Sequence, residues 1–158
     1  MTIIRAAMPA DTAIILGFVR ELAAFEREPD AVVATEPMLA EALFGPRPAA
    51  EAVIAERDGV PIGFALFFAN FSTWTGRQGL YLEDLYVTPS ARGGGVGKAL
   101  LIHLAGIARD RGWARFEWSV LDWNMPAVEF YRAMGAQPMK EWTVQRVSGE
   151  ALARLAGR

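Results

Sequence analysis

The sequence predicts one α/β domain over residues 1–158, built on a mostly antiparallel sheet that leads into a single βαβ crossover. Three observations predict this fold class. Short apolar segments with strand character alternate with longer segments of helical periodicity. Asp58-Gly59 stands between two of the strand-like segments and is a strong signal for a two-residue hairpin turn. A glycine-rich run at residues 92–97 then joins a strand of buried character to a long amphipathic helix.

The first half of the chain is expected to hold two helices and the hairpin. The elements are a strand at 2–6, a helix from Pro9-Ala10-Asp11 to about Phe25, a helix from Thr35-Glu36-Pro37 to Phe44, and hairpin strands at 52–56 and 60–70. The first helix is indicated by apolar side chains at helical spacing: Ile14, Ile15, Phe18, Leu22 and Phe25. Gly45-Pro46 ends the second helix, because neither residue continues a helix readily.

The second half of the chain is expected to alternate strands with helices. The elements are a strand at 80–87, a helix from the glycine-rich run to about Arg111, a strand at 114–121, a helix from Pro126 to Met134, a strand at 142–147 and a terminal helix at 148–158. Gly112 and Gly135 end the two longer helices. Pro126 fits the first turn of its helix, where a missing N–H group costs no hydrogen bond.

Composition excludes several classes of function. The chain is 53% hydrophobic with a net charge of −2, which favours a folded core and offers no basic surface for nucleic acid. No apolar run approaches the ~20 residues of a membrane span, and the N-terminus lacks signal-peptide features, so we expect a cytoplasmic protein without a membrane partner. Cysteine is absent and His103 is the single histidine, which excludes a cysteine acyl-enzyme and argues against a metal site.

The run Arg92-Gly93-Gly94-Gly95-Val96-Gly97, followed by Lys98, predicts a pyrophosphate site. A glycine-rich turn that opens a helix directs several backbone N–H groups at one point, with the positive end of the helix dipole behind them, and Arg92 adds a full charge. Two better-known phosphate motifs do not fit. Arg92 stands where a P-loop requires its first glycine, and Lys98 or Leu100 stands where the dinucleotide fingerprint requires its last.

The remaining pattern, Arg-x-x-Gly-x-Gly between a strand and a helix, resembles the acetyl-CoA pyrophosphate loop of the GNAT superfamily of N-acetyltransferases. Other segments resemble its spermidine/spermine (diamine) and thialysine N-acetyltransferase branch in order and spacing. They are Arg20–Glu26, Phe44-Gly45, Tyr81–Val87, Leu121–Asn124 and Phe130-Tyr131-x-x-x-Gly135-Ala136. The resemblance implies the GNAT fold, with six or seven mixed strands, helices on both faces, a bulge in the strand at 80–87 and a splayed central strand pair.

The resemblance also implies acetyl-CoA as the acetyl donor, without a metal. The residues that it assigns to cofactor binding are Leu85, Tyr86, Val87, Arg92, Gly93, Gly94, Gly95, Val96, Gly97, Lys98, Asn124 and Phe130. Backbone N–H groups of the loop would hold the pyrophosphate, and the edges of Leu85 and Val87 would pair with the pantetheine arm. The N–H group of Leu85 or Tyr86 would donate to the thioester oxygen. Asn124 would hydrogen-bond the arm near the sulfur, its alternative role being to cap the following helix.

Two residues are expected to be catalytic by the same resemblance. Glu83 is the expected general base, acting directly or through a water, because a buried carboxylate has a raised pKa and an amine arrives mostly as ammonium. Its alternative role is an ion pair. Tyr131 is expected to protonate the departing thiolate, its alternative role being core packing. Without cysteine, the acetyl group would pass directly to the amine in a ternary complex.

The acceptor is the part of the function that the sequence leaves open. The resemblance favours a primary amine of a small molecule: a diamine, a polyamine or a lysine-like amino acid. The alternatives are a protein, peptide or antibiotic acceptor, or a non-catalytic CoA-binding module. Strand alternation separates Glu83 from Asp84 unless a bulge intervenes, and Asp84, Glu26 and Trp74 are the candidates for binding the acceptor. Trp74 and Trp142 could form an aromatic wall for a cation. The resemblance further implies a homodimer paired through C-terminal strands.

Overall fold

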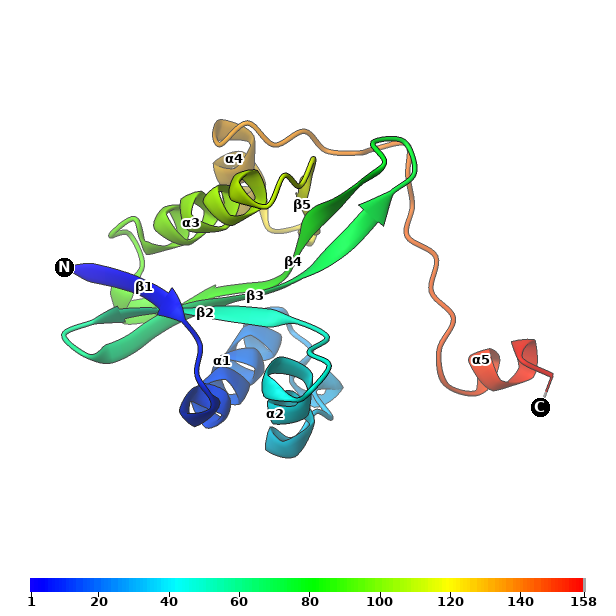
Figure 1. Cartoon of the computed structure of the whole chain (residues 1–158), viewed down its shortest axis with the longest axis horizontal. Coiled ribbons are helices and arrows are strands. Elements are labelled where there is room, and N and C mark those ends of the chain that lie inside the picture. Colours follow the sequence, from blue (N-terminus) through cyan, green and yellow to red (C-terminus); the bar gives the residue numbers. More distant parts are fainter. Residues whose placement is uncertain (158) are drawn as a thin grey trace. The chain divides into compact units, whose positions relative to one another are not determined.

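The structure, a computed structural model, describes residues 1–157 and falls into two compact units (Figure 1). The first comprises Met1–Ser119 and holds the whole sheet, and the second begins at Val120. The strands are β1 (Thr2–Ala6), β2 (Glu51–Arg57), β3 (Val60–Ser72), β4 (Arg77–Val87) and β5 (Phe116–Trp118), in that order across the sheet. The first four are antiparallel to their neighbours, and β5 is parallel to β4. The sheet is mixed, as expected, but the described residues carry five strands rather than the six or seven expected.

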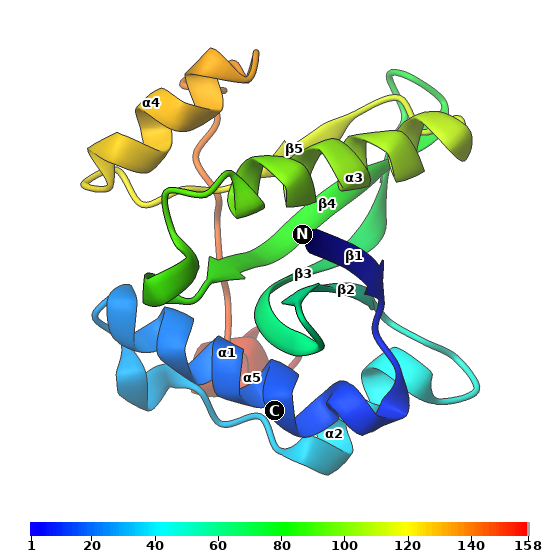
Figure 2. The ribbon, with the colours of Figure 1, turned by 90° about the vertical axis from the view of Figure 1, so that its left-hand side faces the viewer.

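Helices cover both faces of this sheet, as predicted (Figure 2). The helices α1 (Thr12–Phe25) and α2 (Glu36–Phe44) lie on one face, and α3 (Val96–Asp110) lies on the other. A buried cluster fills the face under α1 and α2: Ile15, Phe18, Leu43, Ala52, Ile54, Phe64, Leu66 and Tyr86. The alternating residues Phe67 and Leu82 point to the α3 side and are also buried. Strand alternation therefore determines which residues of the sheet face α1 and α2 and which face α3.

The predicted hairpin between β2 and β3 is present at Asp58-Gly59. Both residues have positive φ, 51° for Asp58 and 77° for Gly59. This is the left-handed conformation that a two-residue turn needs to match the twist of its strands. The turn residues therefore form the connection that the sequence indicated.

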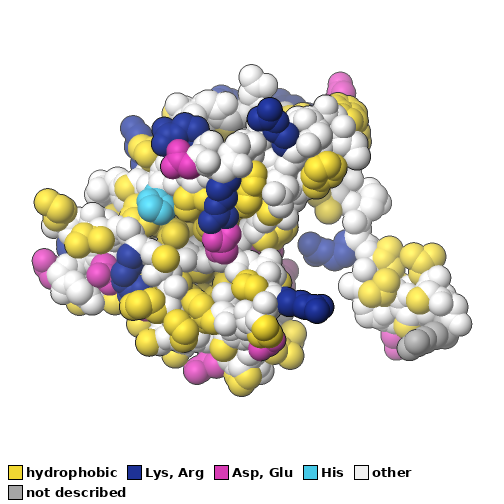
Figure 3. Space-filling view, in the orientation of Figure 1, with side chains coloured by type: hydrophobic (Ala, Val, Ile, Leu, Met, Phe, Trp, Pro, Cys, Tyr) yellow, Lys and Arg dark blue, Asp and Glu magenta, His cyan; other side chains and the backbone are white. Residues whose placement is uncertain are grey.

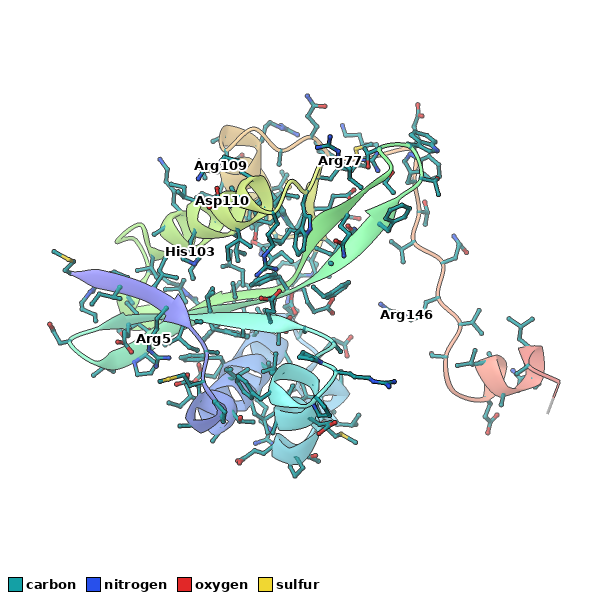
Figure 4. All side chains as sticks on the ribbon, viewed as in Figure 1. Arg5, Arg77, His103, Arg109, Asp110 and Arg146 are labelled. Atoms are coloured by element: carbon teal, nitrogen blue, oxygen red, sulfur yellow. The ribbon has the colours of Figure 1, made fainter. Side chains whose placement is uncertain are left out.

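Arg5 joins β1 and β2 to the start of α1 (Figure 4). Its guanidinium donates to the two carboxylate oxygens of Asp11 at 2.8 and 3.0 Å, and its Nε donates to Glu56 at 3.0 Å. Asp11 is buried, and its bonds to Arg5 lower its pKa. This pairing compensates the burial of the carboxylate and fixes the end of α1 that is farther from Phe25.

β4 carries a bulge at Glu83. Leu66 of β3 stands opposite Asp84, and the next residue of β3, Phe67, stands opposite Leu82. Glu83 is therefore the extra residue on β4, and the bulge expected in this strand is confirmed. Because an extra residue reverses the alternation, Asp84 shares the α1 side of the sheet with Leu66 and Tyr86.

The strand pair β4 and β5 separates after three residues. β5 pairs with Leu80, Tyr81 and Leu82 of β4. Within the described chain no strand covers the same edge of β4 from Glu83 to Val87, so the expected splayed pair is present. β5 itself is shorter than the predicted strand at 114–121, because pairing ends where the two strands diverge.

The second unit holds two short helices, α4 (Met125–Ala133) and α5 (Gly149–Leu155). The strand predicted at 142–147 is wrong for the described structure: these residues form no ladder, and Trp142 and Val144 are exposed. A strand requires a neighbouring strand to pair with, and the five-stranded sheet of residues 1–157 does not include this segment. Among residues 1–157, no helix has the length and apolar composition of a membrane span.

Candidate active site

The glycine-rich loop lies between the end of β4 and the start of α3. Gly93 and Gly95 have φ values of 84° and 79°, a left-handed conformation that favours glycine. Gly95 is the N-cap of α3, and no side chain caps that helix. The first backbone N–H groups of α3, at Val96, Gly97 and Lys98, are therefore left for a ligand at the positive end of the helix dipole.

The open edge of β4 presents backbone groups of alternate residues. The N–H group of Thr88 donates to the Ile62 carbonyl of β3 at 2.9 Å. Strand alternation then directs the N–H and C=O groups of Tyr86 toward β3, and those of Leu85 and Val87 toward the open edge. Of the two N–H groups expected at a thioester oxygen, only that of Leu85 therefore points to this edge.

Arg92 lies at the loop, but its side chain contacts β4 and α1. Its Nε donates to the Val87 carbonyl at 2.9 Å. Its guanidinium carbon is 5.4 Å from the ring centroid of Phe25 and 5.4 Å from that of Tyr86. The positive charge expected beside the loop is present, and it is held by an edge carbonyl and two aromatic rings.

Asp84 is a carboxylate on β4 whose pKa the fold raises. It is half-buried, and burial raises its pKa to about 6, with further contributions from the charges of Glu83 and Glu26. Glu83 is exposed, so the expectation that the fold buries this carboxylate is wrong. The bulge is the physical reason, because it removes Glu83 from the regular alternation. The carboxylates of Asp84, Glu83 and Glu26 therefore interact electrostatically.

Trp74 does not join these carboxylates in the first unit. It lies in the turn before β4 begins at Arg77 and is 80% exposed. The eight residues from Arg77 to Asp84 span roughly 20 Å of strand, so Trp74 is far from Asp84 along β4. The expectation that it contacts the same acceptor as Asp84 is therefore not supported within this unit.

The remaining predicted residues lie in the second unit. Asn124 is the N-cap of α4, but its side chain makes no capping hydrogen bond, which removes the alternative that it serves as a helix cap. Phe130 and Tyr131 are half-buried on α4, with their ring centroids 5.5 Å apart. Trp142, the second member of the expected aromatic wall, is 68% exposed in the segment before α5.

His103 lies on α3, between the buried Leu101 and Leu104, and its side chain reaches the surface (Figure 3). The described residues contain no cluster of three or more histidine, aspartate or glutamate side chains that could hold a metal ion. The single histidine therefore has no ligand set around it in this part of the chain.

Comparison with known proteins identifies this arrangement. The sequence model described as the Acetyltransferase (GNAT) family matches residues 18–136. The chain belongs to this family. It is 39% identical to the thialysine N-epsilon-acetyltransferase of Sus scrofa, over 99% of this chain and 98% of that protein. It is 34% identical to the L-ornithine N5-acetyltransferase of Arabidopsis thaliana, over 94% of this chain and 85% of that protein.

The fold of this GNAT protein is matched by solved structures. An integron cassette protein from the mobile metagenome of V. cholerae superimposes with a TM-score of 0.83 at 28% identity, over 99% of this chain and 98% of that one. The predicted fold and the predicted branch are thereby confirmed. The protein is an N-acetyltransferase with acetyl-CoA as its donor.

Arg57 is a cation beside the GNAT loop that the sequence did not indicate. A Cβ atom added to Gly94 would lie 3.7 Å from its Nη2 atom, and the same nitrogen donates to the Thr2 hydroxyl at 3.2 Å. Arg57 ends β2, 35 positions before Arg92, and reaches the loop only because the hairpin places it there. Its charge adds to the positive potential at the site for the donor's phosphates.

Replacing Gly95 with alanine is expected to weaken acetyl-CoA binding about tenfold and to lower the free energy of unfolding by about 1 kcal/mol. The Cβ atom disfavours the left-handed conformation, and relaxing it turns the N–H groups of the loop away from a bound pyrophosphate. Titration calorimetry and thermal unfolding measure the two effects. Gly106→Ala, in the interior of α3 where a Cβ meets nothing within 4 Å, is the control and should leave binding unchanged. Equal affinity of Gly95→Ala and the parent protein would remove the loop from the donor site.

Proposed function

We propose that this GNAT protein transfers the acetyl group of acetyl-CoA directly to a terminal primary amine of a small molecule: a diamine, a polyamine or a lysine-like amino acid. The observation that carries the proposal is Asp84, a half-buried carboxylate under the influence of Glu83 and Glu26 near the open edge of β4. Three carboxylates attract the ammonium form in which such an amine exists at neutral pH. Both relatives described above are named for acetylating the terminal nitrogen of an amino acid.

Asp84 and Glu83 act as a coupled pair in the removal of the amine's proton, directly or through a water. Burial, and then the charge of Glu83, raise the pKa of Asp84 toward neutrality, where a general base works best. The freed amine nitrogen bonds to the thioester carbon. Leu85 donates its N–H group to the carbonyl oxygen, which carries the negative charge as the bond forms. Glu26 holds the acceptor beside the pair.

Tyr131 protonates the thiolate as the carbon–sulfur bond breaks. A phenol with an ordinary pKa of about 10 carries its proton at pH 7 and can donate it. Asn124 holds the donor's arm near the sulfur, and Phe130 packs beside that arm. The loop from Gly93 to Lys98, with Arg92, holds the pyrophosphate. The amine thereby loses one proton and the thiolate gains one. The acetyl group passes directly from sulfur to nitrogen, so no acyl-enzyme is needed.

A thiol-release assay with acetyl-CoA tests the acceptor class. The panel contains thialysine, ornithine, lysine, putrescine, spermidine, an aminoglycoside and a lysine-containing peptide. We expect kcat/KM to be highest for one of the first five compounds, and mass spectrometry to locate the acetyl group on a terminal amine. A higher value for the peptide or the aminoglycoside would overturn the acceptor class. Release of thiol without any acetylated amine would indicate a non-catalytic or hydrolytic protein.

We also propose a cytoplasmic homodimer in which each chain contributes one single-domain subunit. The support for the dimer is the segment 142–147, which exposes Trp142, Val144 and Val147 and has no strand partner among the described residues. Exposed apolar side chains on a segment outside the sheet are typical of a surface that a second copy covers. Light scattering should give twice the mass of the chain, and a monomer would contradict this assembly.

A further inference from the structure

Arg92 of the donor loop contacts the last residue of α1. Phe25 is the last residue of α1, and its side chain is 45% exposed. The guanidinium of Arg92 lies over its ring, 5.4 Å from the centroid. The two residues are 67 positions apart in the sequence, so the contact joins two separate parts of the first unit. The Arg92 guanidinium is thus a contact that restricts this partly exposed ring.

The other side of that cation is fixed by the core. Tyr86 is 6% exposed, its ring centroid is 5.8 Å from that of Phe18, and Phe18 stacks on Phe64 at 5.6 Å. Burial, and then the nearby Glu21 carboxylate of α1, raise the pKa of Tyr86. Arg92 lies over this fixed ring and also donates to the Val87 carbonyl. These contacts restrict the position of the Arg92 guanidinium, and they therefore also restrict the Phe25 ring that packs against it.

The residue after Phe25 is one of the three carboxylates. Glu26 is the C-cap residue of α1, and its charge contributes to the raised pKa of Asp84 on β4. Glu26 is exposed. Phe25 directly precedes Glu26, so a contact that restricts Phe25 also restricts the backbone position of Glu26.

We propose that Phe25 is a positioning residue for the acceptor side of the site: through its contact with Arg92 it holds Glu26 beside Asp84, and it ties the acceptor carboxylates to the donor loop. This inference rests on the proposed function for the role of Glu26 and Asp84. The consequence is that the aromatic ring at position 25, rather than its apolar bulk, determines how well the amine binds.

Phe25→Leu removes the ring and keeps an apolar side chain of similar size. We expect the KM for the amine to rise about twofold to fivefold, which is the loss of one cation–π contact at an exposed position. The kcat value and the dissociation constant of acetyl-CoA should stay within about twofold. Phe25→Tyr keeps the ring and should restore the parent KM. In an Arg92→Gln background, the effect of Phe25→Leu on the amine KM should be smaller, because the cation that contacts the ring is gone.

A second readout does not depend on turnover. Carboxyl ¹³C NMR follows the titration of Asp84 in the free protein, where the charges acting on it are Glu83 on its own strand and Glu26 after α1. Phe25→Leu should lower the pKa of Asp84, because Glu26 is no longer held close. Phe71→Leu, which replaces another exposed ring on β3, is the matched control and should change neither the pKa nor the KM.

The two proposals fail in different ways. If the parent protein acetylates a small amine and Phe25→Leu changes neither the amine KM nor the pKa of Asp84, the role of Phe25 is overturned and the proposed function stands. If the parent protein acetylates no amine, the proposed function fails, and an unchanged Asp84 titration in Phe25→Leu then overturns the positioning role as well. A lower pKa of Asp84 in that case would support the positioning role independently.

Discussion

Replacing Tyr131 with phenylalanine is expected to lower kcat about 10²-fold or more while the dissociation constant of acetyl-CoA stays within about twofold. The substitution removes one hydroxyl and keeps the ring on α4. If the phenol protonates the departing thiolate, its loss acts on the transition state and leaves the bound donor unchanged. Steady-state kinetics with the best acceptor, together with calorimetric titration of acetyl-CoA, separate the two quantities.

Tyr81→Phe is the matched control for that experiment. Tyr81 is one of three tyrosines, and its hydroxyl lies 3.0 Å from the Ser119 hydroxyl rather than at the open edge of β4. We expect its removal to change kcat less than about threefold. Equal kcat values for the parent protein and Tyr131→Phe would assign the acid to another group or to water. An equal loss in Tyr81→Phe and Tyr131→Phe would indicate a general effect of tyrosine loss rather than a catalytic phenol.

Replacing Asp84 with asparagine is expected to stabilise the protein at pH 7 and to lower kcat/KM about 10²-fold. The pKa of Asp84 is about 6, above its ordinary value of 3.8, so the folded state holds this proton more tightly than the unfolded state. Its favourable contribution to folding is complete below pH 4 and is lost as the pH rises through 6. At pH 7 the buried charge therefore opposes folding, and its removal should add about 1–3 kcal/mol to the free energy of unfolding.

Denaturant unfolding across the pH range measures that change. The gain from Asp84→Asn should disappear below pH 4, where the aspartate is protonated in both states. The exposed Asp110 at the end of α3 (Figure 4) provides the control, since Asp110→Asn removes a charge elsewhere and should show neither the gain nor the loss of activity. A less stable Asp84→Asn protein at pH 7 would contradict the raised pKa.

Glu83→Gln separates the two members of the carboxylate pair. Because the Glu83 charge raises the pKa of Asp84, its removal should move the acid limb of the kcat/KM profile to lower pH. If Glu83 itself takes the proton, the variant should instead lose activity at every pH. The direction of the change thus shows which carboxylate titrates during turnover.

The elements that sequence predicts well are those that local chemistry determines. The stripe of apolar residues in α1, the Asp58-Gly59 turn and the glycine-rich start of α3 all depend on neighbours within a few positions. The strand at 142–147 was predicted by the same local rules and is absent, because a strand forms only with a partner that those rules do not contain.

The position of the candidate residues follows from the sequence order, whereas their electrostatics depend on the fold. The loop, Leu85, Val87 and Asp84 lie along the same end of β4 because they are close in sequence. The burial of Asp84 instead of Glu83 depends on a bulge whose position is set by pairing with β3. The contact of Arg92 with Phe25 and the approach of Arg57 to Gly94 join residues that only the folded sheet brings together.

The bulge at Glu83 also makes the length of β4 more critical than its composition. Before it, Leu80 and Leu82 are directed to the α3 layer, and after it Asp84 and Tyr86 are directed to the α1 layer. Deleting any one residue there would exchange the two layers for everything that follows, moving Tyr86 out of its core and Asp84 away from Glu26. For the packing of this sheet, a change of one residue in the length of β4 is therefore a far larger disturbance than a change of side chain at position 83.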